Sequence, residues 1–152
     1  WSKNSLKGGP IYKWLEDHLD WDRFEFTFVG GCSETLDKVR YVPPLGSRQL
    51  ADELRRHDIY VTASAHDPCS NALIEALSSG LPAIYLNSGG HSELAGGGGL
   101  AFDSAEEIPD LLDRIVDDYS GFQDLINTPD IEDVAGKYMA LMFPEEPPVS
   151  GP

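Results

Sequence analysis

The sequence predicts a three-layer α/β fold built around a doubly wound parallel sheet. Short apolar runs of alternating character are separated by amphipathic stretches of helical length, which is typical of repeated strand–helix units. The 152 residues suffice for one domain with a single core. We expect that domain over residues 1–143, and a flexible tail over the Pro- and Glu-rich residues 144–152.

The first half of the chain is predicted to alternate between helix and strand. A proline near the first turn favours a helix over residues 9–19. The apolar run 24–29 predicts a strand that stops at a glycine pair, and 39–42 predicts a short strand before a proline pair. A helix over 47–56 carries apolar residues on one face, and we expect Ser47 to cap it.

The second half continues this alternation. Its expected elements are a strand over 58–63, a helix over 70–79 closed by Gly80 and Pro82, a strand over 83–86, and helices near 105–118 and 131–142. The glycine run 96–99 lacks the spacing and the terminal lysine of a phosphate-binding loop, so we expect a flexible connection there. In a sheet of this class, ligands bind beyond the carboxyl ends of the strands.

Charge and cysteine content limit the function. The formal net charge of -15 argues against nucleic acid or an anionic membrane as the main partner. Cys32 and Cys69 have no metal-ligand spacing, so we expect no metal, no cofactor, and a reduced pair in the cytoplasm. No apolar run approaches the ~20 residues that a membrane-spanning helix needs. The chain begins at Trp1, which suggests a piece of a longer protein.

The helix over 70–79 contains a single charged residue. Residues 72–77 are apolar except for Glu75, and a helix that is apolar nearly all round is a buried one. A buried carboxylate needs a partner or a function. The alternative is a position at the rim, where Glu75 is solvated or paired with an arginine.

The start of the same helix suits an anion. The amides of Ser70, Asn71 and Ala72 have no acceptor within the helix and lie at the positive end of its dipole. Glu75 follows about 7.5 Å along the axis, at ~1.5 Å per residue. This separation suits a diphosphate at the helix tip and a ribose beside the second turn.

Residues 67–82 resemble the signature of the retaining, GT-B-fold glycosyltransferases of group 1. In that family two acidic residues eight positions apart flank the helix start, as Asp67 and Glu75 do here, and Gly-x-Pro ends the helix. Residues 87–94 are similar to the family's Gly-Gly-x-x-Glu turn, and residues 1–8 to its Lys-Gly loop, which follows the first strand of the C-terminal domain. The resemblance covers most of residues 1–102. It implies a Rossmann-like domain, the C-terminal, donor-binding half of a GT-B fold.

The resemblance implies a role for each matching residue. The catalytic residues would be Asp67 and Lys7, and the substrate-binding residues would be Glu75, Ser70, Asn71, Ala72, Ser88, Gly89 and Gly90. Asp67 would contact the transferred sugar, Lys7 would neutralise the diphosphate, and Glu75 would bind the ribose hydroxyls. The nucleotide base would lie near residues 42–45.

The chain departs from the family pattern at several of these positions. The family usually has Glu where this chain has Asp67, and often a Phe-Gly pair at Cys69-Ser70. An arginine usually precedes the lysine, where this chain offers Ser2 and Lys3. The shorter side chain of Asp67 bears on which sugar is bound, and the missing arginine implies a weaker phosphate site.

Several polar residues also have a simpler interpretation than ligand binding. Lys7 alone is more often a solvated charge than a phosphate ligand. His66 and His91 lie in ligand-edge loops, where contact with solvent is the usual role of a lone histidine. Glu93 either caps the short turn after Gly90 or touches the ligand.

The implied function is transfer of a glycosyl group from a nucleoside diphosphate sugar to an acceptor hydroxyl, with retention, by an enzyme of hexosyltransferase type. The acceptor site, and any peripheral membrane contact, would belong to a missing N-terminal domain. We therefore expect the isolated chain to bind donor weakly and to transfer little. The alternatives are a nucleotide-binding module without transferase activity and half of a GT-B-type nucleotide-sugar epimerase.

Overall fold

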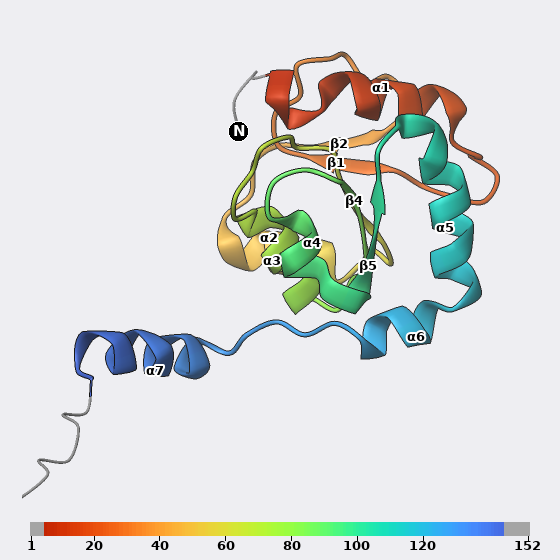
Figure 1. Cartoon of the computed structure of the whole chain (residues 1–152). Coiled ribbons are helices and arrows are strands. Elements are labelled where there is room, and N and C mark those ends of the chain that lie inside the picture. The colour runs from red at the N-terminus through yellow and green to blue at the C-terminus, as the bar shows by residue number, and fades with distance from the viewer. Residues whose placement is uncertain (1–4, 145–152) are drawn as a thin grey trace, which may run out of the picture.

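The structure is a computed structural model, and it describes residues 5–144 (Figure 1). Residues 1–4 of the expected Lys-Gly loop, and all of the expected tail except Pro144, lie outside the described residues. The strands are β1 (Thr27–Val29), β2 (Arg40–Val42), β3 (Tyr60–Thr62), β4 (Ala83–Leu86) and β5 (Gly99–Phe102). The α-helices are α1 (Gly9–His18), α2 (Ser47–Leu54), α3 (Asn71–Ser78), α4 (His91–Ala95), α5 (Ile108–Asp117), α6 (Tyr119–Asp124) and α7 (Ile131–Met142). The short 3-10 helices are η1 (Ser5–Lys7), η2 (Gly96–Gly98) and η3 (Ala105–Glu107).

All described strands pair in parallel, which confirms the predicted α/β class. They form two groups: β1 pairs with β2, and β3, β4 and β5 pair in that order. The strand β1 does not pair with β3, so the described strands make two small sheets instead of one continuous sheet.

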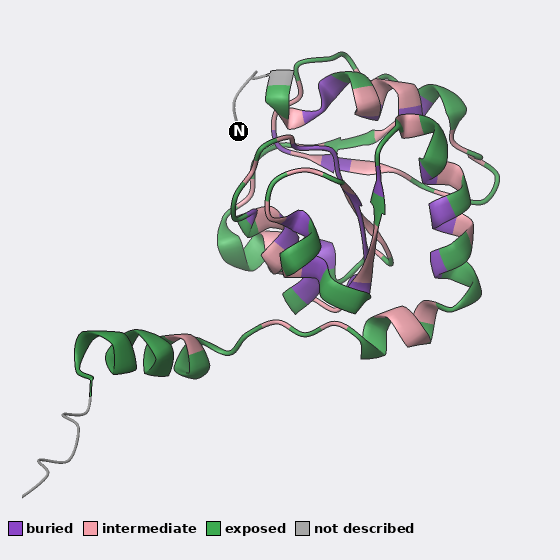
Figure 2. Cartoon of the chain, in the orientation of Figure 1, coloured by how far each residue is buried: buried purple, intermediate pink, exposed green. Residues whose placement is uncertain are grey.

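Helices cover both faces of the strands, which gives the three expected layers. On one face α1 and α5 pack around a cluster that includes Tyr12, Phe28 and Ile84. On the other face α3 packs between α2 and α4, and Leu73 is fully buried there. Figure 2 shows the buried residues gathered where these helices meet the strands. In contrast, α7 has no buried residue and extends away from this body.

Most of the predicted elements are confirmed: β4 has its predicted bounds, whereas β1, β2 and β3 are shorter than expected. The predicted cap at Ser47 is wrong, because Ser47 is the first residue of α2 and Gly46 precedes it as the N-cap. The Gly46 amide donates to the Gln49 side-chain oxygen at 3.4 Å, so the side chain of Gln49 satisfies the amide just before the helix.

The prediction of a flexible connection at 96–99 is also wrong. These residues form η2 and the start of β5. A Cβ on Gly98 would lie 2.7 Å from the side chain of Ile126, and one on Gly99 would lie 2.6 Å from the Ala83 carbonyl oxygen. Both glycines therefore serve close packing rather than flexibility.

Candidate functional site

The predicted lysine and the earlier predicted acid lie together at the carboxyl edge of the strands. Lys7 comes from η1, and Asp67 comes from the loop between β3 and α3. The Lys7 Nζ lies 3.4 Å from Asp67 Oδ2, and both side chains are partly exposed. This ion pair places one cation at the entrance to α3.

Gly8 holds the Lys7 loop against the end of β3. Gly8 has a φ of +77°, and a Cβ at this position would overlap both the side chain and the carbonyl of Ala63. The Leu6 carbonyl accepts a hydrogen bond from the Ala65 amide at 2.7 Å. Only glycine permits this approach, so the position of Lys7 depends on Gly8.

The turn at 88–90 packs against the same β3–α3 loop. The Gly90 amide donates to the Asp67 carbonyl at 3.0 Å, and the His66 amide donates to Ser88 Oγ at 3.0 Å. A Cβ on Gly89, which has a φ of +64°, would overlap the Asp67 backbone. His66 itself has a φ of +56°, a conformation that is strained for a residue other than glycine.

The start of α3 is shaped by a buried serine. Ser70 is 4% exposed, and its Oγ accepts a hydrogen bond from the Leu73 amide at 3.4 Å as the N-cap. Its hydroxyl therefore holds the helix start in shape. Asn71 is exposed and Ala72 is half-buried, so the first turn of α3 lies open beside the Lys7–Asp67 pair.

The expectation that Glu75 is buried is wrong: Glu75 is exposed. The buried residues of α3 are Leu73, Ala76 and Leu77, and the remaining apolar positions are half-buried, so this helix is covered on one side only. Glu75 occupies the rim position that was the alternative, and it lines a cavity together with Ala72. Burial raises the pKa of the neighbouring Tyr60, and the negative charges of Glu75 and Asp67 add to this shift.

Among the other polar residues, His91 departs from expectation. It is fully buried at the start of α4, with Nδ1 3.0 Å from the Leu86 carbonyl oxygen, so it is not a solvent contact. Its Nε2 has no hydrogen-bond partner within the described chain. His66 and Glu93 are both exposed, and no side-chain capping bond is present at the start of α4, so Glu93 does not act as its cap.

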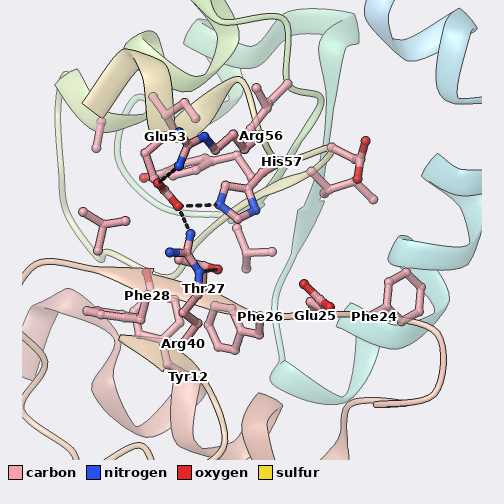
Figure 3. Close-up of a pocket in the computed structure, with 18 of the residues that line it drawn as sticks. Tyr12, Phe24, Glu25, Phe26, Thr27, Phe28, Arg40, Glu53, Arg56 and His57 are labelled. Carbon is pink, nitrogen blue, oxygen red and sulfur yellow. Dashed lines mark hydrogen bonds and ion pairs between the residues drawn. The ribbon is translucent and has the colours of Figure 1, made fainter. Parts of the chain in front are cut away.

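A cavity of about 910 Å³ begins beside Glu75 and runs between β1 and β3 (Figure 3). Pro44 and Leu45, from the region expected to hold the base, line the same cavity as Glu75. One wall carries an ionic cluster that sequence reasoning missed. The buried Glu53 carboxylate pairs with Arg40, with Arg56 at 3.5 Å and with His57 at 3.2 Å.

The ionic cluster around Glu53 joins α2 to β2. Burial is the main cause that lowers the pKa of His57, and the charge of Arg40 lowers it further. Glu53, Arg56 and His57 are three or four residues apart, which is a visible helical spacing. The part played by Arg40 depends on tertiary packing, which local spacing does not reveal.

Residues 5–144 contain no cluster of histidine, cysteine and acidic side chains that could hold a metal ion. Cys32 and Cys69 are both free thiols. Within the same range, no helix has the length and apolar character that crossing a membrane requires.

Residues 13–118 match a family model described as "Glycosyl transferases group 1". The chain belongs to this family. Among curated proteins, a sulfoquinovosyl transferase of Arabidopsis thaliana is 26% identical over 146 residues, which cover 92% of this chain and 25% of that protein.

Solved structures show the same fold at lower identity. Sucrose-phosphate synthase from Thermosynechococcus elongatus aligns with a TM-score of 0.69 at 19% identity, over 94% of this chain and 44% of that one. A chain of a GtfA/B complex aligns with a TM-score of 0.64 at 17% identity, over 93% of this chain and 34% of that one. The likeness confirms the predicted fold class, that of the GT-B glycosyltransferases. This group 1 chain spans a quarter of its curated relative and less than half of these solved chains.

Proposed function

We propose that this group 1 chain binds the nucleoside diphosphate sugar donor of a glycosyl transfer. The observation that carries the proposal is the Lys7–Asp67 ion pair, at 3.4 Å, beside the open first turn of α3. A helix N-terminus and an adjacent ammonium group together form a site for a diphosphate. The α3 amides and the Lys7 ammonium group supply the attraction for a diphosphate in an otherwise acidic chain.

The rest of the donor fits the neighbouring residues. Glu75 lies one turn further along α3 and is exposed, so its carboxylate is available to accept hydrogen bonds from ribose hydroxyls. Pro44 and Leu45 line the cavity that also includes Glu75, and they offer an apolar surface to the base. We assign the transferred sugar to Asp67 and the turn at 88–90, and the backbone contact between these two segments supports a shared role for them.

The proposed reaction transfers the sugar with retention of its anomeric configuration. The bond from the anomeric carbon to the diphosphate oxygen breaks, a bond to the acceptor oxygen forms, and the acceptor proton leaves with the nucleoside diphosphate. Negative charge grows on the diphosphate, where Lys7 and the α3 amides stabilise it. The acceptor site belongs to a further domain, so this chain alone is proposed to bind donor weakly and to transfer little.

Calorimetric titration of the chain with UDP, GDP and ADP tests the donor site. We expect one of these nucleotides to bind, and both Glu75→Ala and Lys7→Ala to weaken its binding at least roughly tenfold, since each removes a charge-assisted contact. Glu132→Ala and Lys137→Ala, at exposed positions of α7, are the matched controls for the changes in charge. Binding that survives both site substitutions would contradict the proposed site, and absence of binding by any nucleotide would contradict donor binding by this chain.

A further inference from the structure

The carboxylate of Asp67 is held in place through both of its oxygen atoms. Its Oδ1 accepts a hydrogen bond from the Cys69 amide at 3.3 Å, and its Oδ2 lies 3.4 Å from Lys7 Nζ. A bond from an aspartate side chain to the amide two residues further on forms a turn of its own. The negative charge of Asp67 is therefore fixed by the loop that contains it, and its side chain is 20% exposed.

The backbone of Asp67 is restrained as well. Its carbonyl accepts from the Gly90 amide at 3.0 Å, and a Cβ on Gly89 would overlap the same carbonyl oxygen. The amide of the preceding residue, His66, donates to Ser88 Oγ at 3.0 Å. Asp67 cannot move away without loss of these contacts, so a ligand bound at this loop meets the carboxylate at close range.

The ion pair also limits the distance between the carboxylate and a bound diphosphate. An ammonium group holds a phosphate oxygen at ~2.8 Å. Since Lys7 Nζ lies 3.4 Å from Asp67 Oδ2, a phosphate oxygen bound by Lys7 would lie within about 6 Å of that carboxylate oxygen. This distance is shorter than the ~8 Å over which physiological salt screens a charge. The carboxylate therefore repels the same phosphate that the ammonium group attracts.

The nucleotide changes its charge at this point when the sugar is transferred. In the donor, bound as proposed above, the terminal phosphate is esterified to the sugar and carries a single negative charge. Transfer leaves a free terminal phosphate, which loses a second proton with a pKa of about 6. At neutral pH the product nucleoside diphosphate is therefore more negative than the donor, at the end that lies beside Asp67.

We propose that Asp67 makes the chain bind the product nucleoside diphosphate less tightly than its charge-matched ester, and so favours the sugar-loaded donor, a role that rests on the proposed donor site. A carboxylate has about four acceptor positions. The Cys69 amide and Lys7 occupy two of them, which leaves positions for hydroxyl groups of the sugar. In the product complex these hydroxyls are gone and the phosphate charge has grown, so the carboxylate promotes release of the product.

A residue that only held Lys7 in position would behave differently. Loss of its carboxylate would free Lys7 to move from the entrance to α3, and the binding of donor and product would weaken alike. Repulsion by Asp67 has the opposite consequence, because removal of the charge strengthens the binding of the product. The two roles therefore differ in the sign of the change in affinity.

Calorimetric titration of Asp67→Asn and of the parent chain distinguishes these roles. Asparagine keeps the oxygen that accepts from the Cys69 amide, so the loop should keep its shape while the charge is removed. One ligand is whichever of UDP, GDP and ADP binds the parent chain. The other is the methyl ester of its terminal phosphate, which has the charge of a donor but no sugar. A chelator is present, so that no divalent cation neutralises the phosphates.

We expect Asp67→Asn to strengthen the binding of the nucleoside diphosphate at least roughly fivefold more than that of its methyl ester, because only the former carries the additional charge. Asp67→Glu keeps the charge and should keep the parent's ratio of the two affinities. Glu75→Gln should weaken both ligands alike, since both contain the ribose, and Asp133→Asn, at an exposed position of α7, should affect neither. The fivefold difference should shrink at 1 M salt, where the screening length falls to ~3 Å.

Equal changes for the two ligands in Asp67→Asn, whether stronger, weaker or none, would overturn this role of Asp67. The donor site itself would then still stand if Glu75→Ala weakens binding. Absence of binding by all three nucleotides would overturn both proposals together. Thermal unfolding checks that the variant folds, and Asp67→Ser, which also offers an oxygen to the Cys69 amide, takes its place if it does not.

Discussion

At the scale of single residues, the candidate site depends on positions where a side chain has no room. Gly8 combines a left-handed backbone with an overlap against Ala63, whereas Gly80 has a φ of +86° and room for a Cβ, which would make only an ordinary contact with the Gln123 side chain at 3.8 Å. A comparison of these two glycines separates the cost of the backbone conformation from the cost of the overlap. Because Gly8 precedes α1 and follows Lys7, any shift there moves the cation of the site.

We expect Gly80→Ala to lower the free energy of unfolding by about 1–2 kcal/mol, the cost of a left-handed conformation. Gly8→Ala should lower it by more, because the overlap with Ala63 is added to the same backbone cost. Urea unfolding of both variants measures the difference. Equal losses at the two positions would show that the packing of Gly8 on β3 contributes nothing.

A buried carboxylate gives the chain a dependence on pH. Glu16 is fully buried, and its carboxylate accepts from Lys13 Nζ at 2.7 Å and from the amides of Lys38 and Val39. Burial acts to raise the pKa of Glu16, but the hydrogen bonds from these partners outweigh it and hold the pKa below the ordinary value of 4.5. The stabilisation is present above that value and is lost as the pH falls through the lower, folded-state pKa.

Glu16→Gln should therefore lower the free energy of unfolding by about 1–3 kcal/mol at neutral pH. The difference from the parent chain should shrink as the pH is lowered below the ordinary pKa of the carboxyl group. Urea unfolding over a pH series measures both effects, and Glu132→Gln at an exposed position is the control. A difference that is constant over the series would rule out the carboxylate charge as its source.

At the scale of elements, α3 matters most because it carries both ends of the proposed donor site. Its boundaries were predictable, since Ser70 before it and Gly80 after it are local signals. The exposure of Glu75 was not predictable, because it depends on which neighbours cover the helix. In the same way, the short strand β5 was missed because Gly99 at its start and Gly98 just before it serve contacts with Ala83 and Ile126, which lie far away in the sequence.

We expect Ser70→Ala to lower the free energy of unfolding by about 1 kcal/mol through loss of the N-cap. The start of α3 should loosen as well, so nucleotide affinity should fall although Ser70 is buried. Ser78→Ala, at an exposed position in the same helix, should change neither quantity. Denaturant unfolding and calorimetry report the two effects. If Ser70→Ala lowers stability but leaves nucleotide affinity unchanged, the N-cap stabilises the helix without contributing to nucleotide binding.

At the scale of the whole molecule, the packed body ends with α6. Tyr119 and Gln123 of α6 bond to the Asp58 and Gly80 carbonyls, and Ile126 packs against Gly98. The helix α7, by contrast, has no buried residue. Sequence periodicity predicted both the parallel class and the position of α7, but it did not reveal the split between β1 and β3, because adjacency in space is not encoded locally.

Truncation after Thr128 should change the free energy of unfolding by less than about 0.5 kcal/mol, the range for surface changes. Truncation after Asp117 should destabilise the chain strongly, since it removes α6 and the contacts at Asp58 and Gly80. Thermal unfolding of the two truncated chains provides the measurement. A large loss on removal of α7 alone would show that this helix docks on the body in solution.

The close packing of the three loops at the candidate site has a consequence for protein engineering. The segments 6–8, 63–70 and 88–90 touch through their backbones, at Gly8 with Ala63, Gly89 with Asp67 and Gly90 with Pro68. A loop grafted alone from a relative would meet neighbours shaped for another backbone, whereas the three transplanted together would keep their mutual fit. Substitutions in different loops should therefore be non-additive, and a search for altered sugar preference would do better to vary the three loops jointly than one at a time.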